Sequence, residues 1–170
     1  MYKTKKLAVA AIFCALAVVG SLFSFPVFAS KCAPVQHMVN ILCAVFLGPW
    51  YGVAVAFIAS LLRNLMALGS LMAFPGSMIG ALLCGVVFWK TRNLTLTLIA
   101  EVFGTGILGG LCAYPIALAF MNVDAATVAF YAYIVPFLIS TVGGSIIAGA
   151  LILALDKTGA LKAMRASLGN

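Results

Sequence analysis

The sequence predicts an all-α integral membrane protein with six transmembrane helices and both termini in the cytoplasm. Of 170 residues, 65% are apolar and only 8% are charged, and the mean hydropathy is +1.23. Several uncharged runs exceed the roughly 20 residues that cross about 30 Å of hydrocarbon. Eight of the ten Lys and Arg residues lie in three clusters between or beyond these runs. Such clusters indicate membrane orientation rather than nucleic-acid binding.

The first predicted span, near residues 7–25, follows a short basic segment with lysines at 3, 5 and 6. This start is similar to a signal peptide, but the apolar run is long, lacks a convincing small-x-small cleavage site and precedes further spans. We therefore expect a mature transmembrane helix. Ala8, Ala11 and Ala15 form a stripe of small residues on it, which would let another helix, in this chain or in a partner, approach closely.

The next uncharged run, residues 32–62, is too long for one span, because at 1.5 Å per residue it would form a helix about 46 Å long. Pro49 cannot donate a backbone hydrogen bond and moves Gly48 away from helical geometry. Trp50 and Tyr51 are aromatics that favour a membrane interface. The run is therefore divided into a second span near 35–47 and a third near 51–68.

The remaining spans are predicted near 74–89, 94–120 and 126–155, so residues 1–170 form one transmembrane domain. Six spans place eight cations on one side of the membrane and Lys31 alone on the other. Five spans would place four cations, including Arg63, on one side and the other six on the opposite side. The positive-inside rule favours six. The loops around Lys31, residues 69–73 and residues 122–124 are then expected to face outward.

Arg63 is the residue that most strongly indicates a site. It is the only charged residue between Cys32 and Trp89, a stretch of 58 residues, and Asn64 follows it. A guanidinium at bilayer depth costs about 2.5 to 3.5 kcal/mol on insertion scales, so chains that keep one usually use it in a pocket, pairing or pathway. The alternative is a snorkelling residue that holds its helix at the interface.

Other polar and aromatic residues gather with Arg63 in the outer halves of the predicted spans, which indicates a pocket open to the outside. Prolines at 75, 115 and 136 could free backbone groups there. The candidate ligand-binding residues are His37, Asn40, Arg63, Asn64, Phe74, Ser77, Tyr114, Tyr133, Phe137 and Ser140.

Three of these interpretations have alternatives. His37 could instead cap the second helix, and the tyrosines could belong to the interfacial aromatic belt. Glu101 is the only carboxylate well inside a predicted span. It could pair with Arg63 across helices, contact the ligand or contact a partner subunit, because intramembrane acids are usually paired.

Several kinds of chemistry are not supported by the sequence. It contains no GxxxxGK[ST], HExxH or GxSxG motif and no paired-carboxylate arrangement, so we expect neither an enzyme nor ATP hydrolysis by this chain. The five cysteines show no CxxC spacing, and four lie in apolar runs, where a thiol behaves as a small hydrophobe. We predict no metal site and no cofactor in this chain.

Six motifs resemble the ThiW family over nearly the whole chain. They are KCAPVQHMVN at residues 31–40, LGPWYG at 47–52, SLLRN at 60–64, FPGSMIG at 74–80, EVFGTGILG at 101–109 and PFLISTVGGS at 136–145. ThiW proteins are similar to the substrate-binding S components of energy-coupling factor (ECF) transporters, which are multi-pass proteins of prokaryotic plasma membranes.

The resemblance implies the fold and the partners of an S component. These are a six-helix bundle with a pocket closed by outer loops, and an alanine-rich first helix that docks a transmembrane coupling subunit. Two ATPase subunits would use ATP to drive uptake, and the S component would topple in the membrane to carry its ligand inward. The family resemblance also implies that the ligand is the thiazole precursor of thiamin.

For neutral hydroxyethylthiazole, Phe74, Tyr114 or Phe137 would stack on the ring, and Asn40, Asn64 or Ser77 would bind its nitrogen and hydroxyl. Arg63 would orient those groups. For the phosphorylated thiazole, Arg63 would bind the anion directly.

The sequence leaves these ligands open. It also leaves open another small vitamin-related ligand, a membrane assembly or structural subunit without a ligand, and a secondary transporter.

Overall fold

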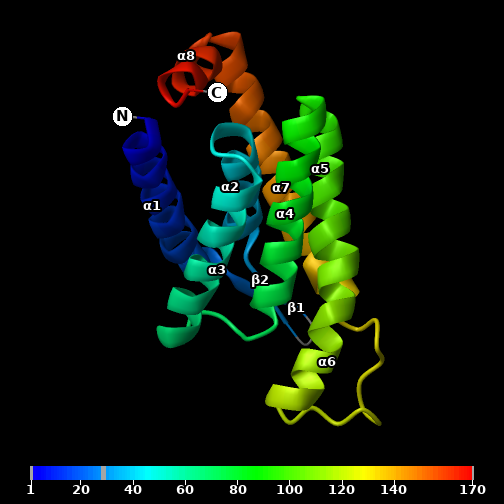
Figure 1. Cartoon of the computed structure of the whole chain (residues 1–170). Coiled ribbons are helices and arrows are strands. Elements are labelled where there is room, and N and C mark those ends of the chain that lie inside the picture. The colour runs from blue at the N-terminus through cyan, green and yellow to red at the C-terminus, as the bar shows by residue number, and fades with distance from the viewer. Residues whose placement is uncertain (1, 28–29, 170) are drawn as a thin grey trace.

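The computed structural model describes residues 2–27 and 30–169, which form a helical bundle (Figure 1). The helices are α1 Tyr2–Gly20, α2 Pro34–Phe46, α3 Pro49–Leu65, α4 Ala73–Thr91, α5 Leu94–Glu101, α6 Gly110–Phe120, α7 Ile134–Lys157 and α8 Ala160–Ser167. A 3-10 turn, Ser21–Phe23, follows α1, and strands β1 (Phe25–Val27) and β2 (Ser30–Cys32) form an antiparallel hairpin. A π-helical segment, Val102–Gly109, joins α5 to α6.

Four helical segments in the described part of the chain are long and apolar enough to cross a membrane. They are Tyr2–Phe23, Ala73–Thr91, Leu94–Phe120 and Ile134–Lys157. Helices α2 and α3 are shorter than these four segments, with 13 residues in α2 and 17 in α3. The fold is therefore mostly helical and has the composition of an integral membrane protein.

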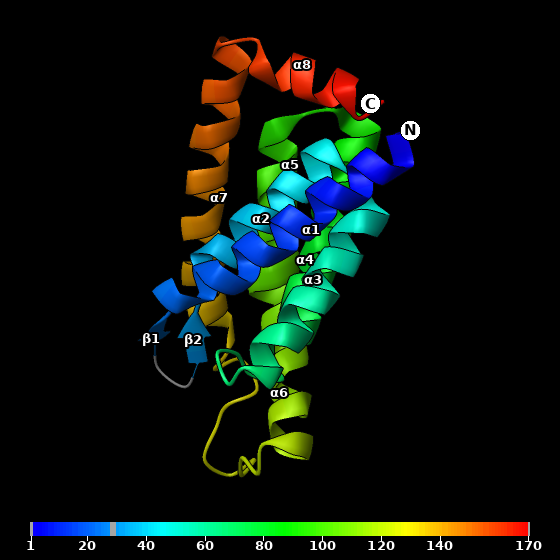
Figure 2. The ribbon, with the colours of Figure 1, turned by 90° about the vertical axis from the view of Figure 1, so that its left-hand side faces the viewer.

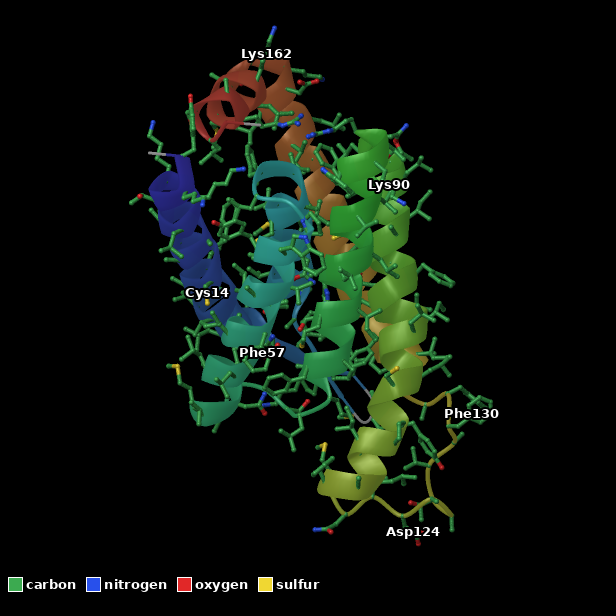
Figure 3. All side chains as sticks on the ribbon, in the orientation of Figure 1. Cys14, Phe57, Lys90, Asp124, Phe130 and Lys162 are labelled. Carbon is green, nitrogen blue, oxygen red and sulfur yellow. The ribbon has the colours of Figure 1, made fainter. Side chains whose placement is uncertain are left out.

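The loops separate into two groups at opposite ends of the bundle (Figures 1 and 2). The termini, α8 and the turn between α4 and α5 lie at one end. The hairpin, the loop after α3 and the loop after α6 lie at the other. Figure 3 shows the same division, with Lys90 and Lys162 at the end of the termini and Asp124 at the opposite end. We call the second of these the hairpin end.

The structure breaks the long apolar run at Gly48, as the sequence predicts. Gly48 has a φ of +90°, a conformation that costs glycine little, and Pro49 is the first residue of α3. Proline is favoured there because the first N–H of a helix has no intrahelical partner. α2 and α3 are therefore separate antiparallel neighbours.

Two helix ends differ from the predicted spans. α7 begins at Ile134, so the predicted start near residue 126 is wrong. Residues 121–133 instead form turns, in which Asp124 Oδ1 accepts a hydrogen bond from Ala126 N at 2.9 Å. Pro136 lacks the N–H that an earlier helix would need, so it is accommodated in the first turn of α7. α1 ends at Gly20, before the hairpin, rather than near residue 25.

Helix α2 forms the centre of the bundle. Every residue from Gln36 to Phe46 is buried, and the helix packs against α1, α3, α4 and α7. A helix without an exposed face must carry its polar groups into the interior, where each needs a partner. The polar residues of α2 therefore define where an internal polar site can form.

Helix α4 packs closely against the π-helical segment through glycines on both sides. A Cβ on Gly109 would lie 2.5 Å from Gly76 Cα, and one on Gly104 would lie 3.1 Å from Gly80 Cα. Small residues at such crossings let two backbones come into contact, which is the usual basis of helix association in lipid.

We expect Gly109→Ala to lower the free energy of unfolding by about 1–3 kcal/mol, because its methyl group would press on the backbone of α4. Gly143→Ala is the matched control, since its Cβ would meet only Pro34 side-chain atoms at 3.7 Å. Denaturation of the purified proteins in detergent measures both. Equal stability of the two variants would contradict this account of the α4 contact.

Candidate functional site

A small polar cavity lies near the hairpin end, between α2, α3, α4, the π-helical segment and α7. Its volume is about 30 Å³, enough for about two water molecules. It is lined by Lys31, Ala33, Gln36, His37, Arg63, Ala73, Gly76, Ser77, Thr105, Phe137 and Ser140. Of the predicted ligand-binding residues, the cavity therefore brings together His37, Arg63, Ser77, Phe137 and Ser140.

Arg63 lies in the last turn of α3 and is only 4% exposed. Its Nη1 donates a hydrogen bond to Gln36 Oε1 at 3.3 Å, whereas its Nε is buried and has no partner among the described residues. The side chain therefore lines the cavity and does not reach the surface of the bundle, which argues against the snorkelling interpretation. Its Nε–H is therefore a donor that no described residue uses.

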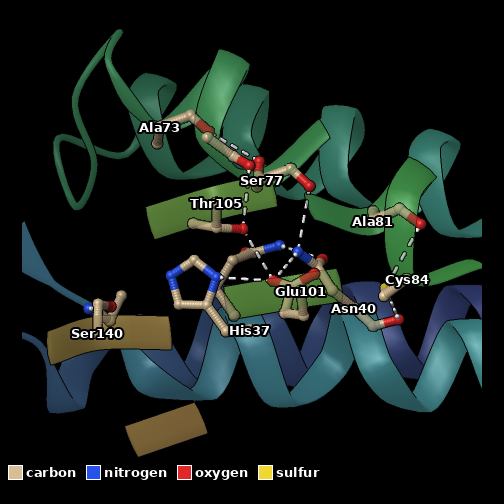
Figure 4. Close-up of polar contacts among 12 residues, drawn as sticks. His37, Asn40, Ala73, Ser77, Ala81, Cys84, Glu101, Thr105 and Ser140 are labelled. Atoms are coloured by element: carbon tan, nitrogen blue, oxygen red, sulfur yellow. Dashed lines mark hydrogen bonds and ion pairs between the residues drawn. The ribbon is translucent and has the colours of Figure 1, made fainter. Parts of the chain in front are cut away.

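Glu101, the last residue of α5, is fully buried and is surrounded by polar groups from two elements, α2 and the π-helical segment (Figure 4). Its Oε1 lies 3.1 Å from His37 Nδ1, 3.0 Å from Asn40 Nδ2 and 3.0 Å from Thr105 Oγ1. Of the three alternatives for Glu101, the direct pairing with Arg63 is therefore not the one that the structure shows. His37 also makes no helix cap, since α2 begins without a side-chain cap.

Two amides connect Arg63 to Glu101 instead. Gln36 accepts from Arg63 and donates through Nε2 to Asn40 Oδ1 at 3.4 Å. Asn40 in turn donates to Glu101. The buried cation and the buried acid are thus linked through neutral side chains of α2 and not by an ion pair between them, while Arg63 Nε and Glu101 Oε2 have no partner among the described residues.

The hairpin is tied to α7 at the edge of the cavity. Ala33 N donates to Ser140 Oγ at 2.8 Å, and Cys32 Sγ donates to the Pro136 carbonyl at 3.1 Å. Burial raises the pKa of the Cys32 thiol, so the thiol keeps the proton that this bond requires. These contacts hold β2 over the start of α7.

The other predicted ligand-binding residues do not line the cavity. Asn40 instead donates a hydrogen bond to Glu101. Asn64 Nδ2 donates to the carbonyls of Ser60 and Ser70, at 2.8 and 3.1 Å, and so stabilises the end of α3. The remaining three make apolar contacts: Phe74 packs on Phe57 with ring centroids 5.6 Å apart, and Tyr114 and Tyr133 pack in the cluster around Met72, Ala113 and Ala117.

Sequence reasoning missed Gln36 and Thr105. Gln36 directly precedes His37, and Thr105 follows Glu101 by four residues, the spacing that brings two side chains to one helix face. The first signal could have identified Gln36, and the second could have identified Thr105. Lys31 was predicted only as a loop residue, yet it lines the cavity.

The predicted docking residues lie on the outside of α1. Ala8, Ala11 and Ala15 are exposed, and Ala11 and Ala15 line an apolar groove of about 420 Å³ between α1 and α3. Ala10 and Cys14, which also line this groove, and Ala17 turn toward the core and are buried. The outer face of α1 therefore has no partner within the described chain.

An apolar bundle with four membrane-length helices has the properties of an integral membrane protein, and the buried polar residues that line its cavity mark a candidate site for a small molecule. A family model described as thiamine-precursor transporter protein, ThiW, matches residues 7–158. The chain therefore belongs to the ThiW family, which is a family of transporters and not of enzymes. A search of curated proteins gives no match.

We expect Glu101→Ala to lower the free energy of unfolding by about 1–3 kcal/mol, because buried hydrogen-bond donors of His37 and Asn40 would lose their acceptor. Asp156→Ala removes an exposed acid near the end of α7 and is expected to change stability by at most about 0.5 kcal/mol. Detergent denaturation compares the two variants, and equal losses would show that the Glu101 contacts contribute nothing specific.

Proposed function

We propose that this chain is the substrate-binding S component of an ECF importer and captures hydroxyethylthiazole or its phosphate outside the cell. Membership in a thiamine-precursor transporter family supports the substrate class. The observation that carries the proposal is the small cavity that Arg63, His37 and Phe137 line together. An S component for another small vitamin-related ligand is the nearest alternative.

We further propose that α1, α2, α3, α4, the continuous segment 94–120 and α7 make six passes through the plasma membrane of a prokaryote. At 13 residues, α2 is about 20 Å long, shorter than the hydrocarbon layer. Its central position supports the assignment, because its surrounding helices shield its ends from lipid. The basic residues at the end of the termini support a cytoplasmic location for that end.

The cavity offers the kinds of groups that a hydroxyethyl-substituted heteroaromatic ring requires. Phe137 provides an aromatic face, and Arg63 and Ser140 provide polar groups. Because the cavity holds only about 30 Å³, its walls must move apart to admit the ring. The hairpin and the loop after α3 close this end of the bundle, so they are the segments whose movement would open it.

Transport would require partner subunits, since the sequence has no P-loop. We assign ATP hydrolysis to two ATPase subunits, and we assign its coupling to transport to a transmembrane coupling subunit. The exposed stripe of Ala8, Ala11 and Ala15 is the proposed docking surface for the coupling subunit, because its small residues allow close helix approach. An assembly subunit without a ligand would use the same surface but would not need the polar cavity.

Binding of hydroxyethylthiazole and its phosphate to the purified protein tests the ligand assignment. We expect Arg63→Ala to raise the dissociation constant of whichever of the two ligands binds wild type by about tenfold to a hundredfold. This is the usual effect of losing a charged hydrogen bond. Arg92→Ala, at the opposite end of the bundle, is the control and should bind normally. The absence of binding by wild type would contradict the proposed function, as would normal binding by the Arg63 variant.

Substitutions on α1 test the partner assignment separately. We expect Ala11→Leu and Ala15→Leu to bind the thiazole normally but to lose most of their assembly with the coupling subunit and ATPases, because leucine fills the groove. Ala150→Leu adds the same bulk at an exposed position of α7 and should assemble normally. Co-purification measures assembly. Normal assembly of both α1 variants, or uptake without any ATPase partner, would overturn this assignment.

A further inference from the structure

We propose that Glu101 fixes His37 in the tautomer protonated on Nδ1, so that Nε2 accepts a hydrogen bond from a hydroxyl group of the ligand. The site would then select the thiazole alcohol over its phosphate ester. The choice of ligand rests on the proposed function above, whereas the tautomer follows from contacts within the chain.

The orientation of the Asn40 amide comes first. Asn40 Nδ2 lies 3.1 Å from the Ser77 carbonyl oxygen, which can only accept a hydrogen bond. The atom facing Ser77 must therefore be the amide nitrogen. On its other side, Asn40 Oδ1 accepts from Gln36 Nε2. The second hydrogen on Asn40 Nδ2 then points to Glu101 Oε1, at 3.0 Å, and Oε1 is an acceptor.

The proton between Glu101 and His37 comes next. Glu101 Oε1 accepts from Asn40 and lies 3.1 Å from His37 Nδ1. Because Oε1 already accepts from Asn40 and lies within hydrogen-bond distance of Thr105 Oγ1, it acts as an acceptor, and the proton of the His37 contact belongs on the ring nitrogen. His37 Nδ1 is thus the donor. A neutral histidine carries one ring proton, and this contact places it on the side away from the cavity.

The second ring nitrogen then faces the cavity as an acceptor. Figure 4 shows the His37 ring between Glu101 and Ser140, with its other nitrogen turned away from Glu101. No group in the described part of the chain makes a hydrogen bond to His37 Nε2.

The remaining polar groups of the cavity determine which other groups of a ligand the site can bind. Arg63 Nε–H is a free donor, and the Ser140 hydroxyl, whose oxygen accepts from Ala33 N, still has its own proton to donate. A neutral ligand with one hydroxyl donor and one ring-nitrogen acceptor matches this set. A phosphate ester lacks the alcohol proton that Nε2 would accept, and although Lys31 and Arg63 would attract it, its charge of about −1.5 to −2 would lie beside an acceptor nitrogen backed by Glu101.

Nitrogen-15 NMR tests the tautomer without any ligand. His37 is the only histidine of the chain, so histidine-labelled protein reports one ring. At about pH 8, where a histidine in water is neutral, we expect a protonated Nδ1 and an unprotonated Nε2 in wild type. Glu101→Ala should give a mixture of tautomers. A wild-type ring protonated on Nε2, alone or together with Nδ1, would overturn the proposal even if that variant fails to fold.

Competition binding tests the selectivity, with hydroxyethylthiazole, its methyl ether and its phosphate as the probes. We expect the alcohol to bind wild type at least about tenfold more tightly than either derivative, because each leaves Nε2 without a donor. In His37→Leu the preference for the alcohol over the ether should disappear. Equal binding of alcohol and phosphate by wild type would overturn the selectivity.

The two experiments separate the possible failures. A wild-type protein that binds no thiazole would overturn the proposed function and the choice of ligand together. The NMR spectrum would still decide the role of Glu101 toward His37, because that measurement uses the protein alone.

Discussion

The carboxylate of Glu101 is the constraint on which the arrangement of the site depends. A carboxylate inside an apolar bundle is destabilising unless polar partners surround it. Here His37 and Asn40 from α2 and Thr105 from the π-helical segment converge on one oxygen. Because these residues come from different elements, satisfying one buried acid fixes the rotation of α2 relative to the long helix 94–120.

The same constraint shapes the backbone around it. A Cβ on Gly80 would collide with Thr105 Oγ1 and would lie 2.7 Å from Glu101 Oε2, so the space for the carboxylate exists only because α4 has no side chain there. The backbone widens into a π-helix immediately after Glu101, and such segments are frequent at functional sites. The polar cavity adjoins this cluster through His37 and Thr105, and the exposed alanines of α1 lie on the outside of the bundle, so the cavity and the α1 stripe are separate surfaces.

Much of this organisation could be predicted from the sequence. The division at Gly48 follows from the length of the apolar run and the properties of Pro49. The position of Arg63 in the cavity wall follows from the cost of an intramembrane charge. The partner of Glu101 could not be predicted, because helix rotation depends on glycine contacts between α4 and the π-helical segment that no local pattern reveals. The hairpin was not predicted because long-range contacts to α7 hold it in place. The late start of α7 was not predicted because local turn hydrogen bonds outweigh the apolar pattern before it.

A double-mutant cycle between Glu101 and His37 tests the central claim most directly. The unfolding free energies of wild type, Glu101→Gln, His37→Gln and the double variant would be measured in the same detergent. If the two side chains stabilise the bundle through their mutual contact, their coupling free energy is about 0.5–3 kcal/mol. Additive losses, with no coupling between the two positions, would contradict the account.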